Sequence, residues 1–177
     1  MSIIPLNRQF LPWTSDTGAD PELLTYFWSS AKLGWPDLLK KHRVVVLAEA
    51  GSGKSTELEE QARLKRETAE PVFHATVQDV GRKGFSAAIG ISTAADLAAW
   101  KASGGPAWFF LDSVDEAKSR DIRLADALRE IALAIQDAEQ HAHIILSGRY
   151  SDWEFRRDLE TLERLVPMPP PDLPQSR

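Results

Sequence analysis

The segment VVVLAEAGSGKST, residues 44–56, constrains the fold of this chain more than any other. It begins with three valines and a leucine, and an unbroken run of β-branched and apolar residues is typical of a buried strand. The run breaks at Gly51 and Gly53, which favour a tight turn, and a helical pattern follows. The segment therefore predicts a strand, a glycine-rich turn and a helix in immediate succession.

The same turn fits the pattern G-x-x-x-x-G-K-[ST] of a phosphate-binding P-loop, except that Ala48 replaces the first glycine. In such a loop, backbone N–H groups surround phosphate oxygens, a lysine contacts the β- and γ-phosphates, and a hydroxyl binds Mg²⁺. A chance Gly-Ser-Gly turn is the alternative, but the flanking strand and helix favour the motif. The candidate cofactor-binding residues are Glu49, Ala50, Gly51, Ser52, Gly53, Lys54, Ser55 and Thr56, of which Ser55 is also a candidate metal ligand.

From Arg43 onward, short apolar runs alternate with amphipathic segments. This pattern indicates βα units and a parallel sheet, so the predicted fold class is α/β. Strands are expected near residues 43–48, 72–77, 107–112 and 143–147, with a weaker fifth near residues 163–168.

The helices between these strands have recognisable signals. Apolar residues at i, i+4, i+7 and i+11 predict one long amphipathic helix over residues 121–139. The pairs Thr93–Asp96 and Ser151–Glu154 match the capping-box pattern of a helix start. Residues 81–84, Gly-Arg-Lys-Gly, read as a loop.

Three parts are expected along the chain. Residues 1–40 form a helical lead-in, with a helix starting at Asp20, and their size favours packing on the nucleotide domain over a separate effector or linker. Residues 41–167 form the P-loop nucleotide-binding domain. Residues 168–177 are rich in proline and read as a tail or linker.

Composition narrows the function classes. The chain has 177 residues, about one domain, and its formal net charge of −5 argues against broad nucleic-acid binding. It has no cysteine, which excludes disulfides and thiolate metal sites. Its start lacks a signal-peptide pattern, and no apolar run approaches the roughly 18 residues of a membrane span, so we expect a cytoplasmic location without a membrane partner.

A second candidate part of the site is WFFLDSVDEA, residues 108–117. An apolar strand that ends in one carboxylate is how P-loop proteins place a Mg²⁺-binding aspartate, here Asp112. Asp115 and Glu116 are candidates for activating a water for attack on the γ-phosphate, with Asp115 preferred. Alone, the segment would read as a solvated acidic turn, but the P-loop upstream favours the catalytic interpretation.

A third part is HIILSGR, residues 143–149, another apolar strand that ends in small residues and an arginine. If this strand lies beside the P-loop strand, its carboxyl end faces the phosphates. Arg149 is then a candidate catalytic residue that contacts the γ-phosphate and stabilises its charge. The alternative is a surface arginine paired with Asp152 or Glu154.

On the segments LAEAGSGKST, FFLDSVDEA and HIILSGRYSDW, the chain resembles the NACHT branch of the STAND class of P-loop NTPases. These are regulatory ATPases of bacterial defence and animal innate immunity. The resemblance covers roughly residues 35–167. It implies a three-layer α/β/α fold with a five-stranded parallel sheet in the order 5-1-4-3-2, and it implies ATP with Mg²⁺ as cofactors.

The same resemblance assigns roles to residues. Lys54 and Ser55 match the Walker A lysine and hydroxyl, Asp112 the Walker B aspartate, Asp115 and Glu116 the additional acids, and Arg149 the sensor arginine. Family members usually continue into helical, winged-helix and repeat regions, which close over the nucleotide and sense a signal. We therefore expect ATP or ADP as ligand, with the missing helical and sensor regions supplied by a larger protein or a partner chain, and a homo-oligomer is an open alternative.

Three functions fit these patterns. The first is a regulatory ATPase in which the γ-phosphate shifts a conformational or oligomeric equilibrium and slow hydrolysis resets it. The second is a P-loop small-molecule kinase, although no arginine-rich lid is visible and the acidic pair favours water as acceptor. The third is a non-catalytic module that binds nucleotide as a structural ligand.

Overall fold

A computed structural model describes residues 8–10, 33–114 and 123–169 of the chain. The predicted helix at Asp20 and the acids Asp115 and Glu116 lie outside the described residues, as does most of the proline-rich tail. The chain divides into two compact units, Met1–Lys41 and His42–Arg177, which are described separately.

The described part of the first unit is small. Phe10 and Leu33 form an antiparallel bridge, with N···O distances of 2.8 and 3.0 Å, and the Phe10 ring packs edge-on against Trp35 at 5.1 Å between centroids. The short helix α2 (Trp35–Leu38) starts where the Asp37 carboxylate accepts the Gly34 N–H at 3.0 Å. This carboxylate caps one of the N–H groups that a helix start leaves unpaired.

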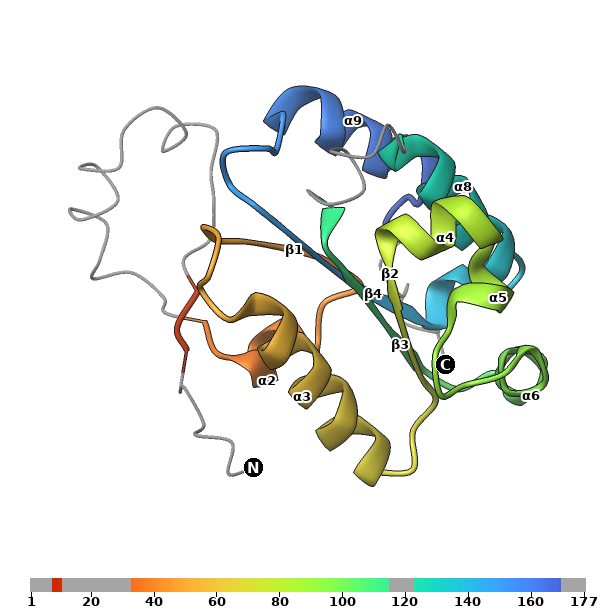
Figure 1. The fold of residues 1–177 in the computed structure, drawn as a ribbon. Coiled ribbons are helices and arrows are strands. Elements are labelled where there is room, and N and C mark those ends of the chain that lie inside the picture. Colours follow the sequence, from red (N-terminus) through yellow and green to blue (C-terminus); the bar gives the residue numbers. More distant parts are fainter. Residues whose placement is uncertain (1–7, 11–32, 115–122, 170–177) are drawn as a thin grey trace, which may run out of the picture. The chain divides into compact units, whose positions relative to one another are not determined.

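The second unit contains a parallel sheet of four described strands (Figure 1): β1 (Arg43–Leu47), β2 (Val72–Thr76), β3 (Ala107–Asp112) and β4 (Ala142–Gly148). Their order is β1-β4-β3-β2. The α/β class and the four stronger strand predictions are therefore confirmed. Every residue of β3 is buried, as expected for a central strand with both faces covered.

The predicted fifth strand near residues 163–168 is wrong. Residues 163–165 form the last turn of helix α9 (Phe155–Leu165), and the residues that follow it, through 169, have no regular structure. Leu162 and Val166 are buried four residues apart, which is the helical period, so the apolar residues here belong to a helix face. The described sheet thus has four strands, in an arrangement compatible with a three-layer α/β/α fold.

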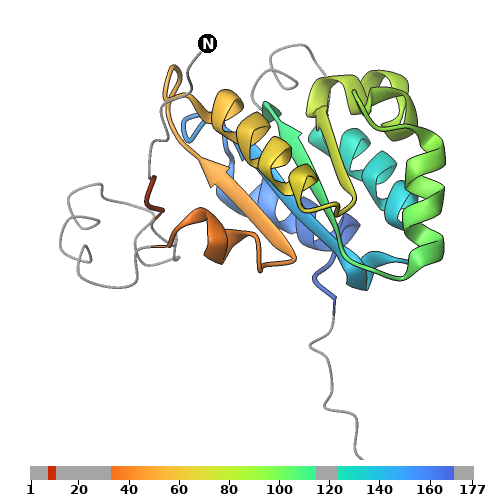
Figure 2. The ribbon, with the colours of Figure 1, turned by 90° about the horizontal axis from the view of Figure 1, so that it is seen from below.

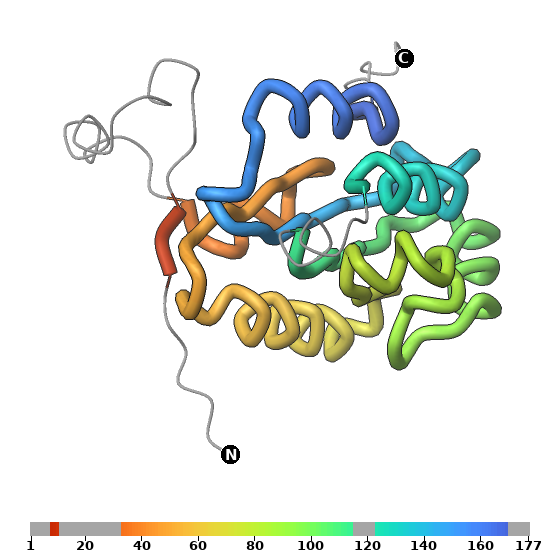
Figure 3. Tube along the Cα trace, turned by 45° about the horizontal axis from the view of Figure 1, so that its top comes forward, coloured from red at the N-terminus to blue at the C-terminus, as the bar shows by residue number. Residues whose placement is uncertain are grey.

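Helices lie on both faces of the sheet. Figure 2 shows α3 (Lys54–Glu67) and α8 (Leu124–Ile135) on opposite faces, and Figure 3 shows α3 and α9 on opposite sides of the strands. Helix α3 packs on β2, β3 and β4, whereas α8 packs against α9 and against α4 (Val77–Lys83). Right-handed crossovers require this arrangement, because the chain crosses from β1 to β2 and then returns through β3 to β4.

The face opposite α3 carries an aromatic core. Phe109 of β3 lies 5.0 Å from Phe73 of β2, 5.5 Å from Phe85 in α5 (Phe85–Ala88), and 5.1 Å from Trp100 in α6 (Ala94–Ser103), measured between ring centroids. Helix α8 covers this cluster with its buried face, which includes Leu124, Leu128, Ile131 and Ile135. The predicted amphipathic helix is confirmed, although it ends at Ile135 and a short 3-10 helix, η1 (Glu139–His141), follows it.

Helix boundaries differ in part from the predictions. The Thr93–Asp96 capping box is confirmed, with the Asp96 N–H donating to Thr93 Oγ1 at 3.2 Å. The Ser151 cap is wrong, because residues 151–152 form a turn and α9 starts after Glu154. Residues 81–83, expected in a loop, form the last turn of α4. No helix in the described ranges is both long and apolar enough to cross a membrane.

Arg43 holds together the end of the sheet where β1 and β4 begin. Its guanidinium donates to the carbonyl oxygens of Ala142 at 2.6 Å, Val166 at 3.2 Å and Pro167 at 3.2 Å. Burial lowers its pKa to about 10, against the opposing effect of Glu139. Arg43 therefore ties the end of α9 to the first residues of two strands.

Candidate functional site

The candidate site lies at the edge of the sheet where the four parallel strands end. Ligands of open α/β sheets bind outside this edge. The loop between β1 and α3, residues 48–53, contains most of the predicted phosphate-binding residues. It begins in contact with β4, because the Ala48 N–H donates to the Gly148 carbonyl oxygen at 3.2 Å.

The loop curls around the side chain of Lys54. Its Nζ donates to the carbonyl oxygens of Ala48 at 2.7 Å and Glu49 at 2.9 Å. Gly51 and Gly53 have φ angles of +72° and +81°, which side chains rarely adopt, so the loop uses two glycines where its path requires them. The ammonium group therefore lies inside a turn of backbone, with carbonyl oxygens as partners.

The first turn of α3 adds exposed donors to this loop. Gly53 is the N-cap, and Ser55 and Thr56 are exposed in the first turn of the helix. The first N–H groups of a helix have no partner within the helix, and together with the helix dipole they favour an anion. Loop, lysine and helix start therefore have the donor chemistry that a phosphate requires.

Asp112 ends β3 and is 6% exposed. One of its carboxylate oxygens, Oδ1, accepts a hydrogen bond from the Ser147 hydroxyl of β4. Within the described ranges, no lysine or arginine forms an ion pair with this carboxylate. A buried carboxylate is costly without a charged partner, and oxygen ligands suit Mg²⁺, so the residue present here fits a divalent cation.

In the described sheet, β4 lies between β1, which leads into the predicted P-loop, and β3, which ends at Asp112. β4 pairs with β1 on one side and with β3 on the other, as required for its end to face the phosphates. Ser147 stands opposite Val46 in the register with β1, and its hydroxyl contacts Asp112 across the other side. The predicted P-loop and the predicted metal ligand are therefore two strands apart at one sheet edge.

Arg149 follows directly after β4. Its side chain is 44% exposed and lies 3.9 Å from a carboxylate oxygen of Asp152, which was one of the alternatives open from the sequence. Glu154, the other alternative, lies 3.3 Å from Arg157. A role for Arg149 at the γ-phosphate stays a prediction, as do the roles of Asp115 and Glu116.

Two residues near Asp112 were not predicted. In the sequence, Ser147 stands out only as one of the small residues that end its strand, although a single hydroxyl at the end of an apolar strand is a usable signal. His74 of β2 is partly buried, and burial lowers its pKa below the ordinary value, while the negative charges of Glu59 and Asp112 act in the opposite direction. Nothing in its sequence context indicated that charge environment.

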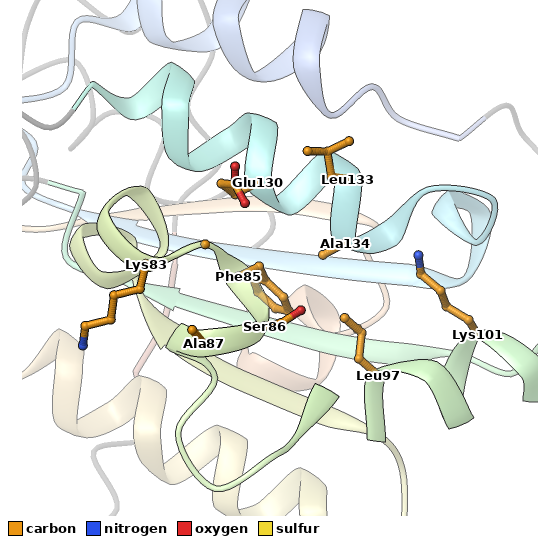
Figure 4. Close-up of a pocket in the computed structure, with 10 residues that line it drawn as sticks. Lys83, Phe85, Ser86, Ala87, Leu97, Lys101, Glu130, Leu133 and Ala134 are labelled. Carbon is orange, nitrogen blue, oxygen red and sulfur yellow. The ribbon is translucent and has the colours of Figure 1, made fainter. Parts of the chain in front are cut away.

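A separate hollow of about 370 Å³ lies between α5, α6 and α8 (Figure 4). Lys83 and Lys101 lie on opposite sides of it, and its lining includes Phe85, Leu97, Glu130 and Leu133. None of the predicted nucleotide-binding residues lines this hollow. The candidate site is therefore the edge formed by the P-loop segment and Asp112.

No model of a known protein family and no curated protein matches the chain.

Proposed function

We propose that this chain is a regulatory NTPase module of the NACHT type that binds ATP and Mg²⁺. The observation that carries the proposal is the loop between β1 and α3, in which two glycines have positive φ and Lys54 donates to two loop carbonyls. Asp112, at the same edge of the sheet, supports the assignment of a metal ligand.

In this proposal each group has one task. Loop N–H groups and Lys54 hold the β- and γ-phosphates, while Ser55 and Asp112 hold Mg²⁺, which supplies neutralisation of the phosphate charge. Asp115 or Glu116 orients and deprotonates the attacking water, and Arg149 stabilises charge on the γ-phosphate. Arg149 would have to exchange its contact with Asp152 for the phosphate, and an exposed pair costs little to break.

The regulatory part of the proposal concerns what the bound γ-phosphate changes. A ligand shifts a conformational equilibrium only through its different affinity for the two states. We propose that the two states differ in the arrangement of helical and sensor regions, which belong to a larger protein or a partner chain in a cytoplasmic defence pathway. Slow hydrolysis then returns the module to its ADP state.

Calorimetric titration with ATP, with and without Mg²⁺, tests the proposal together with an assay of phosphate release in the absence of an added acceptor. We expect ATP binding that is tighter with Mg²⁺, and slow release of phosphate. Formation of ADP only when an acceptor is added, with the phosphoryl group on the acceptor and no phosphate released, would favour the kinase. Equal stabilisation by ATP and ADP without any release would favour the non-catalytic module, and absence of binding would contradict all three functions.

A further inference from the structure

The Ser147 hydroxyl lies between two consecutive residues of the β3 end. It donates to Asp112 Oδ1, and it accepts the backbone N–H of Ser113 at 3.1 Å. Ser147 is 1% exposed and Ser113 is 8% exposed, so water does not compete freely for these bonds. One side chain of β4 therefore holds both the carboxylate and the backbone turn that follows it.

The geometry of this turn is unusual. Ser113 has a φ of +62°, a left-handed conformation that residues with a side chain rarely adopt. A hydrogen bond to its N–H helps to hold that conformation at the residue immediately after Asp112. The direction of the Asp112 side chain is thus coupled to Ser147 through both bonds.

The hydroxyl also determines which carboxylate oxygen of Asp112 accepts a hydrogen bond. A serine hydroxyl has a single donor, and here that donor is used on Oδ1. Within the described ranges, no other hydrogen bond to the carboxylate is present, so Oδ2 is left for another ligand. Carboxylates that bind metals are commonly held by such a hydrogen bond on one side.

The residues that follow Ser147 lie next to the P-loop segment of the site. The Gly148 carbonyl oxygen accepts the Ala48 N–H at the start of the P-loop segment, and Arg149 comes next. Ser147, Gly148 and Arg149 are therefore consecutive at the end of β4. The first holds the candidate metal ligand, the second contacts the P-loop, and the third is the candidate sensor.

We propose that Ser147 is a positioning residue that orients Asp112 for Mg²⁺, an inference that rests on the proposed function. It acts through Asp112 and does not itself bind the ion. If Ser147 has only a structural role, its hydroxyl bonds to the neighbouring strand because a buried polar group needs hydrogen-bond partners. The two roles differ in what they predict for metal affinity.

The test measures the Mg²⁺ concentration that gives half-maximal thermal stabilisation of the full chain at fixed ATP. Ser147→Ala and Ser147→Cys are compared with the parent; the thiol fills the place of the hydroxyl with a larger atom and is a weak donor. We expect this Mg²⁺ concentration to be at least roughly tenfold higher for both variants. ATP affinity in EDTA should be unchanged, because the P-loop is intact.

Two controls separate positioning from stability. Ser92→Ala also removes a serine hydroxyl bonded to a strand, at 2.8 Å from the Val72 carbonyl oxygen, and it should leave the Mg²⁺ requirement unchanged. In an Asp112→Asn background, Ser147→Ala should add no further change in Mg²⁺ requirement, since residues that act through one another are not additive.

The results distinguish a failure of the Ser147 role from a failure of the proposed function. If ATP binds the parent but Ser147→Ala and Ser147→Cys keep its Mg²⁺ requirement, the role of Ser147 is overturned and the proposed function stands. If the Ala variant does not fold, the Cys variant decides. If the parent does not bind ATP in EDTA or in Mg²⁺, the proposed function is overturned, and the role of Ser147 with it.

Discussion

Replacing Gly51 with alanine tests whether the P-loop segment needs its glycine for backbone geometry. Gly51 has a φ of +72°, and a Cβ added there would meet no atom within 4 Å, so no steric clash contributes. The left-handed conformation costs about 1–2 kcal/mol. Loss of chain entropy in the unfolded state returns about 0.4–1 kcal/mol, which leaves a net destabilisation of about 1 kcal/mol.

Gly104 provides a matched control, because it has a φ of +66° and equally open surroundings at the end of α6. For a chain of this size, about 1 kcal/mol lowers the melting temperature by roughly 2–4 °C. We expect Gly51→Ala and Gly104→Ala to show similar shifts in thermal unfolding. Only Gly51→Ala should weaken ATP binding in calorimetry, by roughly tenfold, which corresponds to about 1.4 kcal/mol. Equal ATP affinity in the two variants would show that nucleotide binding does not depend on the backbone conformation at Gly51.

Two further predictions concern stability. Arg43→Met removes the donors to four backbone carbonyls and should lower the free energy of unfolding by about 2–3 kcal/mol in urea. Arg156→Met, at an exposed position on α9, should change it by less than about 0.5 kcal/mol, and equal effects would contradict the role of Arg43. Because burial lowers the pKa of His74 in the folded chain, the unfolded chain takes up the proton first as the pH falls below the ordinary value of 6.5. Stability should therefore fall with decreasing pH below 6.5, and His74→Gln should make that fall shallower in urea titrations at several pH values; parallel curves would contradict this.

The strands were predictable where their apolar runs are flanked by clear breaks. The apolar run at residues 44–47 is soon followed by glycines, and the fully buried β3 follows Gly104, Gly105 and Pro106. The interval between β2 and β3 was harder, because α4 continues through a glycine at position 81 that local propensity alone would place in a loop. Packing of α4 on α8 supplies the stability that propensity does not.

The fifth strand was mispredicted because a short apolar run has no distinctive period. Leu165, Val166 and Met168 fit a strand as well as the end of a helix. Leu162 in α9 and Val166 at its C-cap are both buried, and their spacing of about one helical turn decides the outcome. The same limit applies to Ser147, whose importance comes from Asp112 on another strand. A contact across strands is a property of the sheet order, which local sequence does not contain.

Calorimetric titration of the Lys54→Ala variant with ATP in the presence of Mg²⁺ tests whether the loop between β1 and α3 binds the nucleotide. Lysine to phosphate is a charge-assisted hydrogen bond worth about 1.5–3 kcal/mol, so we expect roughly ten- to hundredfold weaker binding than in the parent. Lys101→Ala removes the same charge at the separate hollow and should bind ATP as the parent does. Parent-like affinity in Lys54→Ala would contradict the assignment of this loop as the nucleotide site.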